Sequence, residues 1–490
     1  MPLILTLDQS TSATKSILFD AAGQVLDKAV REHRQIYPQP GWVEHDAEEI
    51  WQNVLAVISE LTNRNSEKLS QIAGLSITNQ RETILIFDRK TGRPLHNAIV
   101  WQCRRGDLIC QKLQSENRTE SVRQKTGLKI DTCFSASKLK WLISEKPELA
   151  AKLNSGDALI GTIDTYLLYR LTRQRVFATD HTNASRTLLF DIQKLRWDEA
   201  ICELFDVPIR ALPEVRESAA RFGETDADGL LPNAVPIIGV MGDSQASLFA
   251  QRCYKPGTAK ATFGTGTSVL LNIGHDFRLS ERGAITALAW VQNGKPTYAF
   301  EGLINFSAAT LEWLKNQLGL IHDINEVESL ATGVPDNGGV YLVPAFAGLS
   351  APYWSPEARA AIVGLTAHTR REHIIRAALE SIAYQIRDVL EMMRSESEVQ
   401  LQSLHADGGP TRNQFLMQFT ADVIRADLLV SIVPDSSAWG SAMNALAYFG
   451  IPDPSSTTKF RNVRKFNPRM DEANAKRLHE GWKFAVQRVL

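Results

Sequence analysis

Short apolar runs that end at a polar or acidic residue recur along the chain and predict buried strands. Three such runs occupy residues 3–7, 72–78 and 236–242. Asp243 follows the third run at once, and the small residues at 246–250 then predict a helix. Strands that pass through polar residues into helices are typical of α/β proteins.

Longer periodic segments predict helices. Residues 48–61, 301–318 and 372–393 have helical spacing, and the last of these carries a continuous apolar stripe. A further strand over 401–406 leads through Gly408-Gly409 into an apolar helix. A glycine pair between a strand and a helix lets a ligand approach the backbone closely.

Each half of the chain contains a hairpin with a turn rich in hydroxyl groups. In the first half, strand 3–7 reaches Asp8 and a Ser/Thr-rich turn, with Lys15 on the far side. In the second half, Gly264-Thr265-Gly266 separates two predicted strands. Backbone amides, hydroxyls and a lysine can hold phosphate oxygens, and an aspartate can hold Mg²⁺. Each turn alone is also consistent with an ordinary Ser/Thr turn, but the pair predicts two related domains that face each other across a nucleotide.

Charged side chains follow two of the predicted strands. Open α/β sheets place ligand groups at this point, so we interpret Asp243 as a catalytic base at the floor of a cleft between two domains. Its alternative role is a helix N-cap. Arg81 and Glu82 are suited to hydrogen-bonding the hydroxyls of a polyol, with a solvated charged turn as the alternative, and Trp101 would form either an apolar wall or ordinary core.

Composition excludes several classes of protein. The 490 residues suffice for two cores, and a net charge of −1 leaves no electrostatic footprint for nucleic acid or an anionic membrane. Five scattered cysteines without a CxxC pair indicate neither a zinc site nor a disulfide framework. The N-terminus lacks the basic region of a signal peptide, and no apolar run reaches the roughly 20 residues of a membrane span. We therefore expect a cytoplasmic protein.

The chain resembles the FGGY carbohydrate kinases, and within them the glycerol kinases. The segments that carry this resemblance are Asp8-Gln9, 40–46, 77–83, 97–105, 183–187, Gly242-Asp243, 264–266, 351–354 and 407–409. The resemblance implies an α/β fold of two ribonuclease-H-like domains of the actin/hexokinase type, with a central nucleotide and substrate cleft. It places the polyol site and the catalytic base in residues 1–248 and the ATP site in residues 249–490. It also implies a homodimer or a homotetramer.

Roles for single residues follow from the resemblance only. Asp243 would be the general base that takes the proton from the substrate hydroxyl, and Asp8 and Asp243 would hold Mg²⁺. The residues at polyol-binding positions are Arg81, Glu82, Trp101, Cys133, Asp243, Ser244 and Ser268. Those at ATP-binding positions are Thr11, Ser12, Lys15, Thr265, Ala308, Glu312, Gly409 and Asn413.

Several of these residues depart from the family pattern. Cys133, Ser244 and Ser268 stand where glycerol kinases carry Tyr, Gln and Phe, so all three changes remove volume. On the nucleotide side, Lys15 replaces Arg, and Ala308 and Glu312 replace Gly and Gln. Vacated interior space is costly unless something fills it.

The expected function is ATP-dependent phosphorylation of a small polyol, glycerol to sn-glycerol 3-phosphate. A kinase for a four- or five-carbon alditol or ketose is the first alternative, and a catalytically weak nucleotide-gated sensor is the second. The loop before Pro236 lacks the Gly/Lys/Arg-rich sequence that binds fructose 1,6-bisphosphate in some relatives. No histidine lies between residues 182 and 274. We therefore expect a kinase without that effector site and without phosphorylation of a loop histidine.

Overall fold

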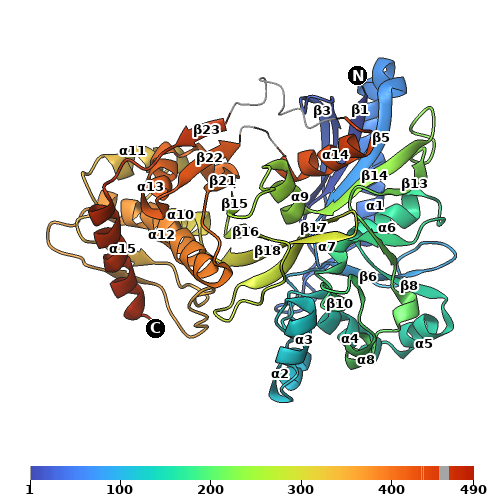
Figure 1. The fold of residues 1–490 in the computed structure, drawn as a ribbon, viewed down its shortest axis with the longest axis horizontal. Coiled ribbons are helices and arrows are strands. Elements are labelled where there is room, and N and C mark those ends of the chain that lie inside the picture. The colour runs from blue at the N-terminus through green and yellow to red at the C-terminus, as the bar shows by residue number, and fades with distance from the viewer. Residues whose placement is uncertain (1, 432, 434, 452–462) are drawn as a thin grey trace. The chain divides into compact units, whose positions relative to one another are not determined.

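The computed structural model describes residues 2–431, 433, 435–451 and 463–490, and the chain forms two compact units (Figure 1). Unit 1 comprises the described residues of 1–250, 287–298 and 435–460. Unit 2 comprises those of 251–286, 299–434 and 461–490. The expected boundary at 248/249 therefore lies beside the first change of unit, and two later segments return to unit 1.

Six of the described strands form the main sheet of unit 1, in the order β13-β14-β5-β1-β2-β3. Their bounds are Arg221–Thr225, Val235–Gly242, Ile72–Asn79, Leu3–Gln9, Ala13–Phe19 and Val25–Glu32. β14, β5 and β1 are parallel neighbours, whereas β2 and β3 pair antiparallel. The strands predicted over 3–7, 72–78 and 236–242 are thus confirmed, and they are almost entirely buried.

The register of these three strands decides where their ends lie. Asp8 of β1 is paired with Thr78 of β5, and Thr78 is paired with Met241 of β14. Parallel strands present their carboxyl ends at one edge of a sheet. Asp8, Arg81 and Asp243, which follow or end these strands, are therefore delivered to the same edge.

A smaller sheet and several helices complete the first half of unit 1. The strand order is β4-β7-β6-β8, with bounds Glu44–His45, Ala98–Ile99, Ile84–Asp88 and Ala158–Thr162. The helices are α1 (Ala47–Arg64), α2 (Asp107–Ser115), α3 (Thr119–Thr126), α4 (Ser135–Glu145), α5 (Pro147–Ser155), α6 (Ile163–Leu171), α7 (His181–Ala184) and α8 (Glu199–Leu204). Short strands β9 (Ala178–Asp180), β10 (Phe190–Asp191), β11 (Arg196–Trp197) and β12 (Glu214–Arg216) lie among them. α1 confirms the helix predicted over 48–61: Asp46 caps it, and it packs on β2 and β3.

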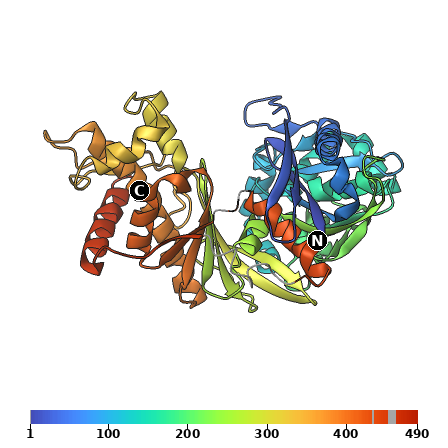
Figure 2. The ribbon, with the colours of Figure 1, turned by 90° about the horizontal axis from the view of Figure 1, so that it is seen from above.

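Two helices at the main sheet come from distant parts of the chain. α9 (Asp243–Ala250) begins where β14 ends, and α14 (Ser436–Tyr448) packs on α9, β1, β5 and β14. Figures 1 and 2 show α14, in orange-red, beside the blue strands of the N-terminus. The Ser441 hydroxyl donates to the carbonyls of Ile77 (2.9 Å) and Gly239 (2.6 Å), which fixes α14 to two of the strands.

A second large sheet, most of whose strands belong to unit 2, repeats part of the arrangement of the first. Its order is β17-β18-β16-β15-β21-β22-β23, with bounds Ile285–Gln292, Lys295–Ile304, Thr267–Gly274, Thr258–Phe263, Ser403–Asp407, Asp427–Ser431 and Val463–Phe466. β15 pairs antiparallel with β16 and parallel with β21, as β1 does with β2 and β5. The two related domains predicted from the two hairpins are present.

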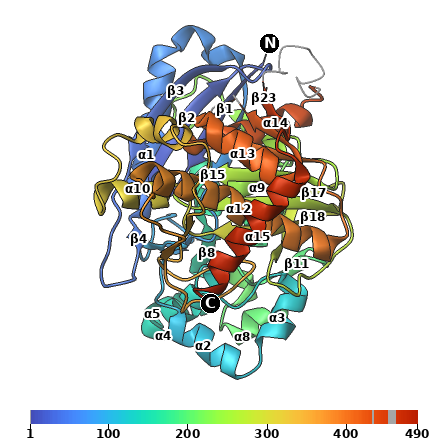
Figure 3. The ribbon, with the colours of Figure 1, turned by 90° about the vertical axis from the view of Figure 1, so that its left-hand side faces the viewer.

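The helices of unit 2 gather on this sheet. They are α10 (Ala308–Asn316), α11 (Val327–Thr332), α12 (Arg371–Ser397), α13 (Gln414–Ile424) and α15 (Glu472–Gln487), with β19 (Tyr341–Val343) and β20 (Ala361–Val363) nearby. Figure 3 looks onto α12, α13 and α15, which contact one another. α12 confirms the helix predicted over 372–393, because its stripe at Ile375, Leu379, Ile382, Ile386 and Leu390 is buried.

The predicted helix over 301–318 was wrong at its start. Residues 301–304 end strand β18, and α10 begins only at Ala308. A Cβ atom added to Gly302 would lie 2.5 Å from the side chain of Val389, so this part of β18 lies tightly against α12. The local sequence does not reveal that contact.

Candidate functional site

Asp243 begins α9 at the carboxyl edge of the main sheet of unit 1. Its Oδ1 accepts a hydrogen bond from the backbone N–H of Ser244 (2.6 Å), and 39% of its side chain is exposed. An N-cap residue stands before the helix and bonds to an amide two or three residues on. Asp243 is instead the first residue of α9 and is partly exposed, so the structure favours a carboxylate that a ligand can reach.

Arg81 and Glu82 lie beside this carboxylate. The Arg81 Nε atom is 3.3 Å from Asp243 Oδ1 and 3.8 Å from Glu82 Oε1, and its Nη1 donates to Gln245 Oε1 (3.1 Å). The side chains of Arg81 and Glu82 are only 9% and 6% exposed. A solvated charged turn is thereby excluded, and three predicted polyol-site residues come together.

Trp101 and Cys133 are two further residues predicted for the polyol site. The indole N–H of Trp101 donates to Thr11 Oγ1 (3.0 Å), so the expected apolar wall is tied to the expected phosphate turn. Burial raises the pKa of the Cys133 thiol to about 12, with the negative charge of Glu82 adding to the effect. Lys138 holds the Cys133 backbone by donating to the carbonyls of Thr132 and Cys133 (both 2.7 Å).

The turn after β1 contains a chain of alternating charges. Lys15 Nζ lies 2.8 Å from Asp8 Oδ2 and 3.2 Å from Asp435 Oδ1, and Lys28 Nζ lies 2.7 Å from Asp435 Oδ2. Burial alone would lower the pKa of Lys15, but the charges of Asp8 and Asp435 outweigh it and raise that pKa. The expected phosphate-binding lysine is thus held by two carboxylates, of which the sequence analysis named only Asp8.

The carboxylates at this edge fit a magnesium ion bound to a nucleotide. Asp8 lies near the end of β1, and Asp243 directly follows β14. These two strands lie on either side of β5, so roughly 10 Å of sheet separates them. Mg²⁺ is usually held by one or two carboxylates together with substrate phosphates. Among the described residues there is no group of three or more His, Cys, Asp and Glu side chains that could hold a metal unaided.

In unit 2, the turn between β15 and β16 is joined to the start of α10. The N–H groups of Ser307 and Ala308 donate to the carbonyls of Thr265 (2.8 Å) and Gly264 (3.1 Å). A Cβ atom on Gly266 would lie 2.4 Å from the carbonyl oxygen of Ile304, so only glycine fits there. These hydrogen bonds place Thr265 next to Ala308, and Glu312 follows one turn further along α10. The three residues are therefore neighbours, as expected if all of them contact ATP. Ser268, on β16, has a buried hydroxyl with no hydrogen-bond partner among the described residues.

Gly409 and Asn413 line a cavity of about 390 Å³ in unit 2, within the usual size range of small-molecule sites. The other lining residues are Ile324, Asn325, Glu328, Leu379, Pro410, Arg412 and Leu416. Nothing lies within 4 Å of a Cβ position on Gly409, which leaves its backbone open to a ligand. The sequence analysis missed Ile324 to Glu328, because they lie some 80 residues upstream and carry no recognisable pattern.

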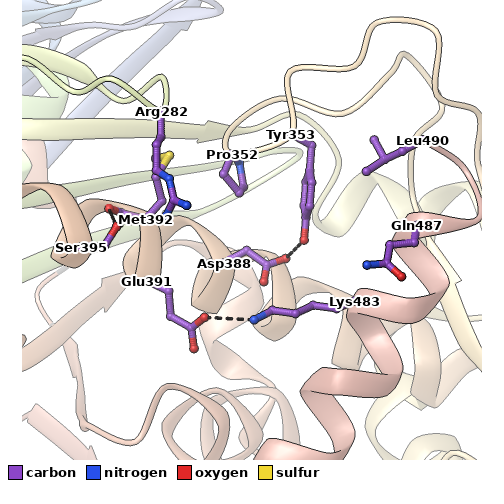
Figure 4. A pocket seen from close by; sticks show the side chains of 10 residues that line it. All are labelled: Arg282, Pro352, Tyr353, Asp388, Glu391, Met392, Ser395, Lys483, Gln487 and Leu490. Atoms are coloured by element: carbon purple, nitrogen blue, oxygen red, sulfur yellow. Dashed lines mark hydrogen bonds and ion pairs between the residues drawn. The ribbon is translucent and has the colours of Figure 1, made fainter.

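A second cavity of unit 2, of about 650 Å³, contains none of the predicted residues. Figure 4 shows its lining: Arg282, Pro352, Tyr353, Asp388, Glu391, Met392, Ser395, Lys483, Gln487 and Leu490. Asp388 accepts hydrogen bonds from the Tyr353 hydroxyl (2.8 Å) and the Trp482 indole (2.7 Å), and Lys483 lies 3.5 Å from Glu391. Both acids are thus paired within the protein, and we assign this cavity no role.

Two further expectations concern cysteines and membranes. All five cysteines are free thiols, as the spacing indicated. Among the described residues, no helix is both long and apolar enough to cross a membrane.

Comparison with known proteins agrees with this geometry. Residues 3–250 match the model of the N-terminal domain of the FGGY family of carbohydrate kinases, and residues 259–448 match that of its C-terminal domain. A glycerol kinase of Carboxydothermus hydrogenoformans is 46% identical over 99% of this chain and 98% of its own length. Glycerol kinase 1 of Thermotoga maritima is 44% identical over 99% of both chains.

Solved structures give the same result. The crystal structure of Plasmodium falciparum glycerol kinase with ADP covers 100% of this chain, with 98% of that chain matched, a TM-score of 0.95 and 37% identity. A ligand-bound xylulose kinase from Lactobacillus acidophilus has a TM-score of 0.90 at 20% identity over 100% of this chain and 98% of its own, and shares the fold. With both family domains matched in order and relatives of this similarity along nearly the whole length, the chain belongs to the FGGY family of carbohydrate kinases.

Proposed function

We propose that the protein phosphorylates glycerol with ATP to give sn-glycerol 3-phosphate. The observation that carries this proposal is the buried group of Arg81 and Glu82 against the reachable carboxylate of Asp243. A cation and an anion side by side can together hold neighbouring hydroxyls of a polyol while a third group takes a proton. The relatives that are 44–46% identical over nearly the full length are glycerol kinases, which supports the choice of glycerol.

Each side chain has a part in the proposed reaction. Asp243 takes the proton from the attacking hydroxyl, and Arg81, 3.3 Å away, holds that carboxylate in place. Glu82 and Arg81 fix the remaining hydroxyls, and Trp101 packs on the carbon chain. Such positioning and charge stabilisation supply most of the catalysis in phosphoryl transfer.

The nucleotide is assigned to three sets of residues. The turn of Thr11, Ser12 and Lys15 and the turn at Thr265 would contact phosphates. The cavity at Gly409 and Asn413 would take the adenosine, with Ala308 and Glu312 next to the second turn. When bound, Mg²⁺ neutralises charge on the phosphates, and Asp8 and Asp243 are the carboxylates that would hold it.

A longer polyol is the second candidate, and Ser268 favours it. Its buried hydroxyl lacks a hydrogen-bond partner among the described residues, and such a group is costly to leave unpaired. Cys133 and Ser244 are also smaller than the residues expected there. A four- or five-carbon alditol carries additional hydroxyls, which suit an unpaired hydroxyl of this kind.

ADP release across glycerol, erythritol, threitol, ribitol, xylitol and dihydroxyacetone, with ATP and Mg²⁺, tests both candidates. Highest kcat/KM on glycerol supports the main proposal, and a maximum at four or five carbons supports the alternative. The Asp243→Asn variant should lose about 10²-fold or more in kcat. No polyol-dependent release would refute both and favour a nucleotide-gated sensor.

Location and assembly complete the proposal. We assign the protein to the cytoplasm, because the reaction consumes ATP and all five cysteines are free thiols. The homodimer or homotetramer implied by the family stays a prediction, which sedimentation analysis can test.

A further inference from the structure

The segment from Asp180 to Thr187 has no part in the reaction described so far. It contains α7 and part of the sequence that carries the family resemblance, yet none of its residues is among the candidate site residues. Every residue in it is buried. One of its side chains contacts Glu82, and another contacts the backbone of Gly242, next to Asp243.

Arg186 is the first of these residues. Its Nε atom donates to Glu82 Oε1 at 2.5 Å, and its side chain is 1% exposed. Its guanidinium also lies over the ring of Phe134, 5.1 Å from the ring centroid. The pair is therefore a buried, directional contact, and it acts on a residue that we assign to polyol binding.

Glu82 has a backbone that needs such support. Its φ of 64° lies in the left-handed region, which costs a residue with a Cβ roughly 1 kcal/mol or more. Such conformations persist where the surroundings hold them. Ser135 donates to the Glu82 carbonyl (2.8 Å), and Arg186 holds the carboxylate at the other end of the residue.

Arg186 also decides which carboxylate oxygen faces a ligand. Arg186 at 2.5 Å and Arg81 at 3.8 Å both approach Oε1 of Glu82. The two nearest contacts of the guanidinium groups with Glu82 thus converge on one oxygen of its carboxylate. Oε2 is thereby left as the acceptor for a substrate hydroxyl.

Thr182 makes a second contact from the same segment. The backbone N–H of Gly242, next to Asp243, donates to Thr182 Oγ1 (2.8 Å), and that hydroxyl donates to Asp180 Oδ2 (2.7 Å). One buried segment thus contacts both Glu82 and the strand end that carries Asp243.

We propose that Arg186 is a positioning residue for polyol recognition: it clamps Glu82 through Oε1 so that Oε2 accepts a substrate hydroxyl. The inference rests on the proposed function, because it assumes that Glu82 binds the polyol. Arg186 acts through Glu82, so its loss should weaken polyol binding more than nucleotide binding.

The test compares Arg186→Gln and Arg186→Lys with the unsubstituted chain. We expect Arg186→Gln to raise the KM for glycerol at least about tenfold, because hydrogen bonds to charged groups are the strong ones, while the KM for ATP stays within about twofold. Arg186→Lys, which keeps the charge but not the rigid planar group, should recover part of the loss. Arg186→Gln removes the nearer of two cations from a buried carboxylate, so thermal unfolding is measured for each variant. If Arg186→Gln is unfolded, the KM values of Arg186→Lys decide between the outcomes.

Arg170→Gln is the matched control. Arg170 pairs with Glu48 at 2.8 Å, lies over the Trp51 ring at 4.7 Å and is 13% exposed, but it contacts none of the site residues. Arg170→Gln should lower the unfolding temperature without changing the KM for glycerol. An unchanged KM in both Arg186 variants, or equal rises in the two KM values, would overturn the positioning role alone. Absence of polyol-dependent turnover in the unsubstituted chain would overturn the proposed function and this inference with it.

Discussion

Gly440→Ala should impair the proposed catalytic base without touching it. Gly440 lies on α14 where this helix crosses α9, and an ideal Cβ on Gly440 would lie 1.8 Å from the carbonyl oxygen of Ala246. Real Cβ atoms essentially never approach closer than 3.0 Å, so the two helices must separate by at least 1.2 Å. The obstacle is backbone, so no change of rotamer can relieve it.

The displacement should fall on α9. On its other side α14 is held by Ser441, which donates to the carbonyls of Ile77 and Gly239. α9 is short and starts with Asp243, one turn before Ala246. A misplacement of about 1 Å can cost 10²-fold in rate, and overpacking typically destabilises by about 1–3 kcal/mol. Without the clash, alanine would instead favour the helix by roughly 1 kcal/mol.

Steady-state kinetics with glycerol and ATP, together with thermal unfolding, measure both effects. We expect kcat to fall by roughly 10²-fold and the unfolding temperature to fall as well. Gly333→Ala is the control, because Gly333 has an ordinary negative φ and its nearest contact would be 3.3 Å away. A Gly440→Ala protein with parental kcat and an equal or higher unfolding temperature would refute the reasoning.

Three further predictions concern charge and pH. Burial, aided by His33, lowers the pKa of His45 to about 3, so below pH 6.5 the unfolded chain binds a proton that the folded chain does not. As the pH falls from 6.5 to about 3, the free energy of unfolding should therefore fall by up to about 1.4 kcal/mol per pH unit. Urea titrations should show that this free energy depends less steeply on pH in His45→Gln than in the parent; equal slopes would contradict the prediction. Burial and the neighbouring Asp180 raise the pKa of Asp164 to about 7, so the folded chain keeps a proton that the unfolded chain loses above about pH 4. The stability that the protonated Asp164 carboxyl contributes is lost as the pH rises from about 4 to 7. The free energy of unfolding of Asp164→Asn relative to that of the parent should therefore grow over this range; a difference between the two proteins that does not change with pH would refute the raised pKa of Asp164. Lys15→Met should raise the KM for ATP about tenfold and leave that for glycerol unchanged, because it removes the cation at the phosphate turn; equal changes in both values would count against a role in nucleotide binding.

Local pattern was sufficient for the elements with a clear period. The strands β1, β5 and β14 and the helices α1 and α12 follow from apolar runs and stripes, because burial of one face or of a whole strand leaves a periodic trace. The register of parallel strands then makes the positions of Asp8, Arg81 and Asp243 at one edge a near consequence of the sequence. The repeated hairpin likewise indicated two related domains.

Contacts between distant segments needed the tertiary structure. Nothing local indicates that residues 436–448 join the first sheet, that residues 301–304 end a strand, or that Ile324 lines the cavity of Gly409. The same holds for Arg186, because an arginine in a turn has the same local pattern whether water or Glu82 receives its hydrogen bond. The sequence by itself indicated the candidate site residues and the strands that deliver them. Only the folded chain decided which side chains support them, since burial and pairing depend on neighbours about 100 or more residues away.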